Sequence, residues 1–130
     1  MKNKKSFLQV RDDLQNQKTT VRSITANYIK SIHDNKDLNI FIEVFENEAL
    51  SRANEIDEKI KSKTHGKLAG MIIAIKDNLC YENHLVTASS KILKGFKSNY
   101  SATAIEKLLN EDAIITVSYT HLRAHETTSY

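Results

Sequence analysis

The sequence predicts an α/β protein in which N-terminal helices are followed by the first strands of a mixed sheet covered by helices. In the first half of the chain, apolar residues recur every three or four positions, which is typical of amphipathic helices. Two short apolar runs follow, over 71–75 and 113–116, with a helical pattern between them. A strand, a helix and a second strand in this order favour parallel neighbours in one sheet.

Two helices are expected at the N-terminus. The first spans 6–16, with Ser6 as a candidate N-cap. The second spans roughly 20–34 and can be capped by Thr19 or Thr20. Their predicted inward residues are Phe7, Val10 and Leu14 in the first helix and Val21, Ile24, Tyr28 and Ile32 in the second.

An extended stretch over 40–45 leads into a third helix, which is predicted from Glu46 to Lys61 with Gly66 as its stop signal. Its expected inward residues are Ala49, Ala53, Ile56 and Ile60. The pattern of apolar residues changes after this helix. Residues 1–65 are therefore predicted to form an N-terminal helical region.

Residues 66–116 are predicted to begin an α/β core. The first apolar run is typical of a strand buried on both faces, as in a parallel sheet. A loop and a short helical piece over 91–93 follow, and Ser101 is expected to cap a helix over 102–112. The predicted apolar face of that helix is Ala104, Leu108 and Leu109. The second apolar run is interpreted as another buried strand.

Composition indicates one soluble domain. The chain has 130 residues, of which 40% are hydrophobic and 27% charged, and no apolar run approaches the length of a membrane span. The basic N-terminus lacks the apolar segment of a secretory signal. Cys80 is the single cysteine, so no internal disulfide is possible, and it is interpreted as a small packing residue. Together these features predict a cytoplasmic protein.

Lys76 is the residue with the clearest chemical potential, because it ends the first apolar run and is followed by Asp77. Burial of an amine disfavours its charged form, so a lysine at the mouth of a buried strand can act as a base at neutral pH. The structural alternative is that Lys76 marks the strand end and extends to water. Spacing alone favours this alternative.

Three segments resemble the amidase signature family: GKLAGMIIAIKDN over 66–78, TASSKILKGF, and SATAIEKLLNEDAIIT. The resemblance covers about residues 5–116 and implies the start of an amidase-type sheet. It also implies a serine hydrolase, in which a nucleophilic serine is activated by a second serine on a cis peptide and a lysine deprotonates that second serine. Lys76 matches this lysine, so the resemblance favours a catalytic role for it. The resemblance assigns no metal ligand and no substrate-binding residue in this chain.

The pairing of VTASSKILKGF with NYSATAIEKLL most resembles one branch of the family, the A subunits of glutamyl-tRNA(Gln)/aspartyl-tRNA(Asn) amidotransferases. This implies an intact protein that hydrolyses glutamine and supplies ammonia to convert Glu-tRNA(Gln) to Gln-tRNA(Gln). The implied partners are a B subunit, which would use ATP and Mg, and a small C subunit. Two alternatives stay open: a stand-alone amidase acting on another small amide, and a non-catalytic helical interaction module.

The C-terminal stretch 117–130 departs from the family, which continues toward a Gly/Ser-rich loop that holds both serines. Instead, Val117 to Thr127 looks like one reading frame of a transposase-type sequencing adapter. We therefore expect 117–130 to be read-through rather than natural sequence. The spacing of His121 and His125 could suit a metal, but under this interpretation the pair is accidental.

No other serine pair replaces the expected nucleophile. Ser89 and Ser90 are adjacent, but they lie in a segment that the family does not use for nucleophiles. The sequence therefore predicts a polypeptide that has the base, Lys76, without the two serines that it would serve. We expect this truncated chain to be inactive by itself.

Overall fold

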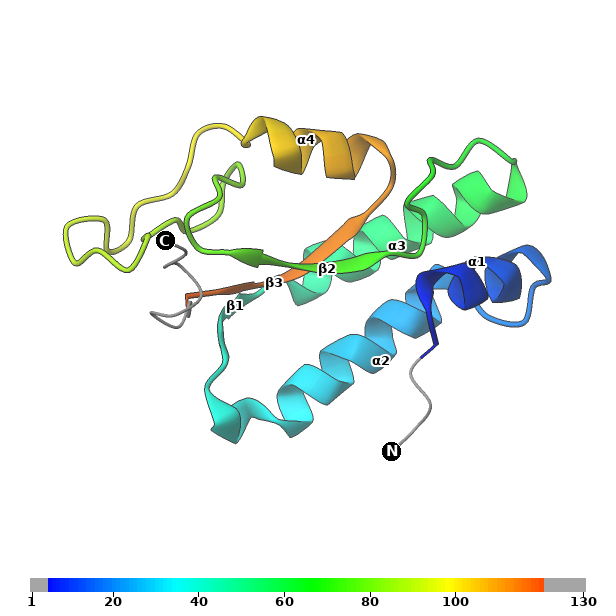
Figure 1. Cartoon of the computed structure of the whole chain (residues 1–130), viewed down its shortest axis with the longest axis horizontal. Coiled ribbons are helices and arrows are strands. Elements are labelled where there is room, and N and C mark those ends of the chain that lie inside the picture. The colour runs from blue at the N-terminus through cyan, green and yellow to red at the C-terminus, as the bar shows by residue number, and fades with distance from the viewer. Residues whose placement is uncertain (1–4, 121–130) are drawn as a thin grey trace, which may run out of the picture.

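The computed structural model describes residues 5–120, and it has the α/β architecture that the sequence predicts (Figure 1). Four α-helices, one short 3₁₀ helix and three strands are present in this part of the chain. In chain order they are α1 (Phe7–Gln15), α2 (Val21–Asp34), η1 (Lys36–Leu38), β1 (Phe41–Val44), α3 (Glu46–Lys61), β2 (Ile72–Lys76), α4 (Thr103–Asn110) and β3 (Ile114–Tyr119). None of these helices is long and apolar enough to cross a membrane.

The three strands form a mixed sheet with the order β1-β3-β2. The central strand β3 is parallel to β2, as the strand–helix–strand order predicts, and antiparallel to β1. The parallel pair aligns Ile72 with Ile114 and Lys76 with Tyr119, and its register shifts once, between Ile73 and Ala74. The sheet is therefore mixed because a strand from the N-terminal region pairs with a strand of the predicted core.

Helices cover the sheet on both faces, with α1, α2 and α3 on one side and α4 on the other (Figure 1). Successive residues of a strand point to opposite faces, so Ile114 and Ile115 of β3 enter different apolar clusters. The cluster on the α1–α3 side contains Leu14, Val21, Ile29, Ala49, Ala53, Ile56, Ala69 and Ile114. The cluster on the α4 side contains Phe45, Ile75, Tyr81, Ile105 and Ile115.

The N-terminal helices begin where their sequence signals place them. The Ser6 hydroxyl accepts a hydrogen bond from the Gln9 N–H at 3.3 Å, and the Gln9 side chain accepts from the Ser6 N–H at 2.8 Å. This reciprocal pair is a capping box. The Thr20 hydroxyl caps α2 by accepting from the Ser23 N–H at 3.1 Å. Helix α3 has the predicted bounds.

The inward face of α2 differs from the prediction at three positions. Tyr28 was expected to face the core but is 51% exposed, whereas Thr25 and Ile29 are buried. Together with Val21 they repeat every four residues, which keeps them on one helical face. Thr25 was not recognised as an inward residue because it is polar. Its hydroxyl donates to the Val21 carbonyl at 2.8 Å, which satisfies its hydrogen-bonding capacity inside the core.

Gly66 does not end α3, contrary to the prediction. The C-cap is Ser62, and the left-handed residue that follows is Lys63, with φ of 58°. Gly66 is required for a different reason. A Cβ atom at this position would lie 2.5 Å from the carbonyl carbon and oxygen of Glu111, which belong to the backbone and cannot move aside cheaply. The glycine therefore permits close packing of the segment before β2 against the end of α4.

A buried carboxylate reinforces the same junction. Asp112 is almost fully buried, and its two oxygens accept hydrogen bonds from the Lys59 amine and the Gly66 N–H, each at 2.7 Å. Burial alone would raise the pKa of Asp112, but these hydrogen bonds and the charges of Lys59 and Arg52 outweigh it, so the pKa lies below its ordinary value of 3.8. Asp112 thus joins α3 to the segment that leads into β2.

The strand that carries Lys76 is less buried than predicted. β2 begins at Ile72, and of its residues only Ile75 is fully buried, while Ala74 is exposed. The expectation of burial on both faces is wrong for β2, because β2 lies at the edge of the described sheet. The central strand β3 is the one buried along most of its length.

Two further expectations between β2 and β3 are wrong. Residues 91–93 form a turn rather than a helical piece. Ser101 does not cap α4, because its hydroxyl instead accepts from the Glu82 N–H at 3.0 Å, and the N-cap position is held by Ala102 without a side-chain bond. On α4 itself, Leu108 and Leu109 are partly buried as predicted, but Ile105 is fully buried and takes the place expected for Ala104, which is exposed.

Strand β3 continues beyond residue 116, where the sequence placed its end. Val117 and Ser118 are both buried within it. The remaining residues of the unusual C-terminal stretch, 121–130, lie outside the described part of the chain and include His121 and His125. The origin of this stretch stays a prediction.

Candidate active site

Lys76 lies at the carboxyl edge of the sheet, the edge where open α/β sheets bind ligands. It is the last residue of β2 and pairs in register with Tyr119, the last residue of β3. Its side chain is partly buried. Within residues 5–120, none of the ion pairs involves the Lys76 amine. The candidate base therefore stands at this edge without an acidic partner from the described residues.

Asp77 follows Lys76 and is only 3% exposed. One oxygen of its carboxylate accepts a hydrogen bond from the Thr87 N–H at 3.0 Å, and the other accepts from the Thr87 hydroxyl. Its backbone is also engaged, because its N–H donates to the Tyr119 carbonyl at 2.8 Å and its carbonyl accepts from the Ala88 N–H at 3.1 Å. Asp77 thus connects the ends of β2 and β3 to a turn in the following loop.

That turn, formed by Thr87–Ser90, has an unusual backbone. The Ser90 N–H donates to the Thr87 carbonyl at 2.7 Å, and between them Ala88 and Ser89 have φ values of 47° and 60°. Two successive left-handed residues are typical of a type I′ turn, which favours glycine and asparagine. Side chains such as those of Ala88 and Ser89 cost about 1–2 kcal/mol each in this conformation. The surrounding contacts must therefore hold the turn in place.

A second polar cluster fastens the same loop to α3. The Tyr81 hydroxyl donates to one oxygen of Glu48, and the other oxygen of Glu48 lies 2.7 Å from His84 Nε2. The Tyr81 and His84 rings stack with centroids 4.0 Å apart, and Phe45 packs edge-on against both. Burial raises the pKa of the Tyr81 phenol well above its ordinary value, and the hydrogen bond to Glu48 and its negative charge raise it further.

Within residues 5–120, the hydrogen bond found for the Cys80 thiol does not involve a base. The thiol lies 3.4 Å from the Tyr100 hydroxyl, a contact that raises the pKa of Tyr100. His84 was the nearest histidine in sequence, but its ring nitrogens face the Glu82 carbonyl, at 2.7 Å, and Glu48. This arrangement offers no nucleophilic pair of cysteine and histidine within the described residues.

The described residues contain no group of three histidine, cysteine, aspartate or glutamate side chains that could hold a metal ion. The pair considered in the sequence, His121 and His125, lies outside them. Ser89 lies at the exposed tip of the Thr87–Ser90 turn and Ser90 at its partly buried end. The hydrogen bonds found for these two serines within residues 5–120 do not involve Lys76.

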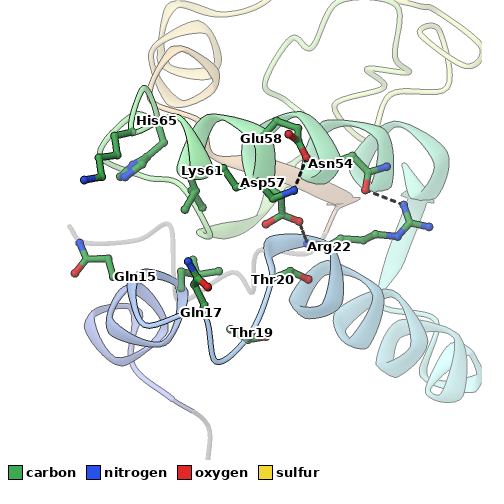
Figure 2. A pocket seen from close by; sticks show the side chains of 13 residues that line it. Gln15, Gln17, Thr19, Thr20, Arg22, Asn54, Asp57, Glu58, Lys61 and His65 are labelled. Carbon is green, nitrogen blue, oxygen red and sulfur yellow. Dashed lines mark hydrogen bonds and ion pairs between the residues drawn. The ribbon is translucent and has the colours of Figure 1, made fainter.

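A cavity of about 1080 Å³ lies away from Lys76 (Figure 2). It is an open cleft between the α1–α2 turn and the C-terminal half of α3. Asp57 stands at its centre and accepts hydrogen bonds from the N–H groups of Val21 and Arg22, at 2.7 and 3.0 Å. Arg22 also donates to the Asn54 side chain at 3.1 Å. These polar groups form hydrogen bonds with one another. The cleft therefore indicates no particular chemical reaction, and the carboxyl edge of the sheet is the better candidate for the active site.

Sequence reasoning identified Lys76 but assigned no role to the groups that fix its surroundings. The sequence pointed to Asp77 only as the residue that follows Lys76. Thr87 gave no signal, because its partnership with Asp77 spans ten positions and depends on the path of the loop. Glu48 and Tyr81 are 33 residues apart, and no local pattern joins them.

Comparison with known proteins identifies the family. The family model described as Amidase matches residues 23–122. The chain therefore belongs to the amidase signature family.

Two curated relatives are both described as the A subunit of a glutamyl-tRNA(Gln) amidotransferase. The protein from Brachyspira hyodysenteriae (strain ATCC 49526 / WA1) is 38% identical over 117 residues, which are 87% of this chain and 24% of the relative. The protein from Chlorobium phaeobacteroides (strain DSM 266 / SMG 266 / 2430) is 42% identical over 110 residues, which are 84% of this chain and 23% of the relative. The chain thus spans about a quarter of the length of these relatives.

A solved structure supports the same fold. A bacterial aryl acylamidase of the amidase signature family superposes with a TM-score of 0.80 and 20% identity, over 89% of this chain and 25% of that protein. At this level of identity the likeness establishes the fold alone.

Proposed function

We propose that this chain is the N-terminal part of the amidase component of a tRNA-dependent amidotransferase, the component that hydrolyses glutamine. The observation that carries the proposal is the identity of 38% and 42% to two such A subunits across more than four-fifths of the chain. Because the chain spans about a quarter of those relatives, the activity would belong to the longer protein.

In this proposal Lys76 is the catalytic base. Its amine would take the proton of a serine hydroxyl, and that serine would in turn deprotonate the nucleophilic serine. The nucleophile would then attack the carboxamide carbon of glutamine. The proton held by the Lys76 amine would return through the serine relay to the leaving nitrogen, so that the C–N bond breaks, ammonia departs and an acyl-enzyme remains, which water hydrolyses. The position of Lys76 at the carboxyl edge of the sheet, without an acidic partner among the described residues, is consistent with this role.

The ammonia would pass to a B subunit, which would activate Glu-tRNA(Gln) with ATP and Mg, and a small C subunit would complete the assembly. The complex would act in the cytoplasm. The 130-residue polypeptide alone would be inactive, because it would supply the base without the two serines. The names of the relatives support a multi-subunit amidotransferase.

The proposal is tested by following the amide nitrogen of glutamine. The full-length protein is produced with its B and C partners and supplied with ¹⁵N-amide glutamine, ATP, Mg and Glu-tRNA(Gln). We expect ammonia release and ¹⁵N in Gln-tRNA(Gln). Hydrolysis of simple amides without transfer of nitrogen to tRNA would contradict the proposal and favour a stand-alone amidase. No amide hydrolysis at all would favour the interaction module.

A further inference from the structure

Asp77 is a buried acid without a basic partner in the described structure. It is 3% exposed, and none of the ion pairs within residues 5–120 includes it. Burying a carboxylate is costly unless hydrogen bonds replace its water. The hydrogen bonds found for its two oxygens both come from Thr87. The cost of burying the Asp77 carboxylate is therefore offset by hydrogen bonds from a single residue, Thr87. This indicates that the contact between Asp77 and Thr87 is important for the local structure.

The contact holds a strained turn. Ala88 and Ser89 are exposed and left-handed, and such conformations persist only where surrounding structure fixes them. The Asp77 carboxylate fixes the first residue of the turn, Thr87, and the Asp77 carbonyl fixes the second, through the Ala88 N–H at 3.1 Å. Asp77 therefore holds the first two residues of the turn, Thr87 and Ala88, by hydrogen bonds.

The same residue fixes the backbone beside Lys76. The Asp77 N–H belongs to the peptide group that joins it to Lys76, and it donates to the Tyr119 carbonyl at 2.8 Å. The carbonyl of that peptide group, on Lys76, accepts from the Leu79 N–H at 3.0 Å. Both polar atoms of the peptide are thus engaged, and the Asp77 side chain ties this point of β2 to the turn.

We propose that Asp77 is a positioning residue for Lys76: by joining the end of β2 to the Thr87–Ser90 turn, it fixes the backbone from which the Lys76 amine extends. The inference rests on the proposed role of Lys76 as the base. A misplacement of a reacting group by about 1 Å can lower the rate by about a hundredfold. Because Asp77 acts on the base rather than on bound substrate, its loss should lower kcat and leave KM nearly unchanged.

The test measures glutamine hydrolysis by the complex that contains the full-length protein, with rates expressed per folded molecule. The folded fraction is taken from the amplitude of the cooperative unfolding transition. Asp77→Ala should lower kcat at least about tenfold with KM within about twofold of wild type. Asp77→Asn keeps an acceptor for the Thr87 N–H and should restore most of the rate. Glu82→Ala removes an exposed acid from the same loop and serves as the matched control.

Thr87 variants provide a second test that does not depend on recovering folded Asp77→Ala. Thr87→Val removes the hydroxyl that Asp77 binds and should lower kcat, whereas Thr87→Ser retains the hydroxyl and should match wild type. The double variant Asp77→Ala/Thr87→Val should be no slower than Asp77→Ala, because both changes break the same contact.

Two results would overturn the inference. The first is a kcat per folded molecule within about twofold of wild type for both Asp77→Ala and Thr87→Val. The second is an equal loss of kcat in Thr87→Ser and Thr87→Val. Lys76→Ala in the same assay tests the proposed function separately. If Lys76→Ala hydrolyses glutamine at the wild-type rate, the proposed function fails, whatever the Asp77 variants do. If Lys76→Ala is inactive and Asp77→Ala is not impaired, only the positioning role fails.

Discussion

Replacing Asp112 should separate two contributions to the stability of the junction between α3, α4 and the segment before β2. These are the hydrogen bond from the Gly66 N–H and the ion pair with the Lys59 amine. Asp112→Ala removes the acceptor of the Gly66 N–H and the partner of the Lys59 amine. Asp112→Asn retains an oxygen for Gly66 but loses the negative charge. The two variants therefore differ mainly in whether the Gly66 N–H keeps its partner.

The magnitude follows from these contacts. A hydrogen bond to a charged group contributes about 1.5–3 kcal/mol, and a donor left without an acceptor costs a similar amount. The Lys59 side chain is 46% exposed, so solvent screens its ion pair with Asp112, which contributes at most about 1 kcal/mol. Asp112→Ala should therefore lower the free energy of unfolding by about 3 kcal/mol and Asp112→Asn by about 1 kcal/mol. For a chain of this size the larger value corresponds to a fall in Tm of about 10 °C.

The effect should also depend on pH in a defined direction. The pKa of Asp112 is lower in the folded protein than its ordinary value of 3.8. The unfolded state therefore binds more protons in this range, and stability falls as pH falls. The difference between wild type and Asp112→Asn should be complete at neutral pH, start to shrink as pH approaches 3.8, and disappear below the folded-state pKa.

The assay is urea unfolding followed by far-ultraviolet circular dichroism at a series of pH values. Asp37→Asn is the matched control, because Asp37 is exposed on η1 and has no ion pair among the described residues. Equal destabilisation by Asp112→Ala and Asp112→Asn would refute the role assigned to the Gly66 hydrogen bond. A wild-type advantage over Asp112→Asn that persists at the most acidic pH would refute the role assigned to the charge.

Two other predictions concern single contacts. Gly66→Ala should destabilise the fold more than Gly95→Ala, because a Cβ at Gly66 meets the Glu111 backbone at 2.5 Å, whereas Gly95 has nothing within 4 Å and suffers only from its positive φ; equal losses of Tm would contradict this. Tyr81→Phe should remove one tyrosine that ionises well above the ordinary tyrosine pKa in a spectrophotometric titration, because burial and the Glu48 carboxylate raise the pKa of Tyr81. An unchanged alkaline end of that titration would contradict the raised pKa of Tyr81.

Local signals in the sequence predict most of the helical region. The N-cap at Ser6, a cap at Thr19 or Thr20 and the bounds of α3 were predicted from residues close to one another in the chain. The structure agrees with all three and has Thr20 as the cap of α2. The parallel pairing of β2 and β3 also follows from the order of elements. The caps and helix bounds were predictable because each is encoded by neighbouring residues.

Most of the errors share a physical cause, which is that partners distant in sequence decide the outcome. Thr25 is the exception, because its hydroxyl bonds to Val21 within its own helix, which allows this polar residue to lie on the face that packs into the core. Gly66 is needed by Glu111, which lies far along the chain, and not by the helix that it follows. The strand with Lys76 was expected to be buried, but its place at the edge of the described sheet leaves Ala74 exposed. For the site, sequence identified the candidate base but not Thr87, which the fold brings to Asp77.

The central claim, that Lys76 is the base of a glutamine-hydrolysing amidase, is tested most directly by one kinetic comparison. The complex with the full-length protein is assayed for ammonia release from glutamine with wild type, Lys76→Ala and Lys76→Arg, and with Lys91→Ala as an exposed-lysine control. Arginine stays protonated and cannot accept the proton, so we expect both Lys76 variants to lose at least about a thousandfold in kcat. Lys91→Ala should match wild type. Activity in Lys76→Arg or Lys76→Ala close to that of wild type would contradict the account.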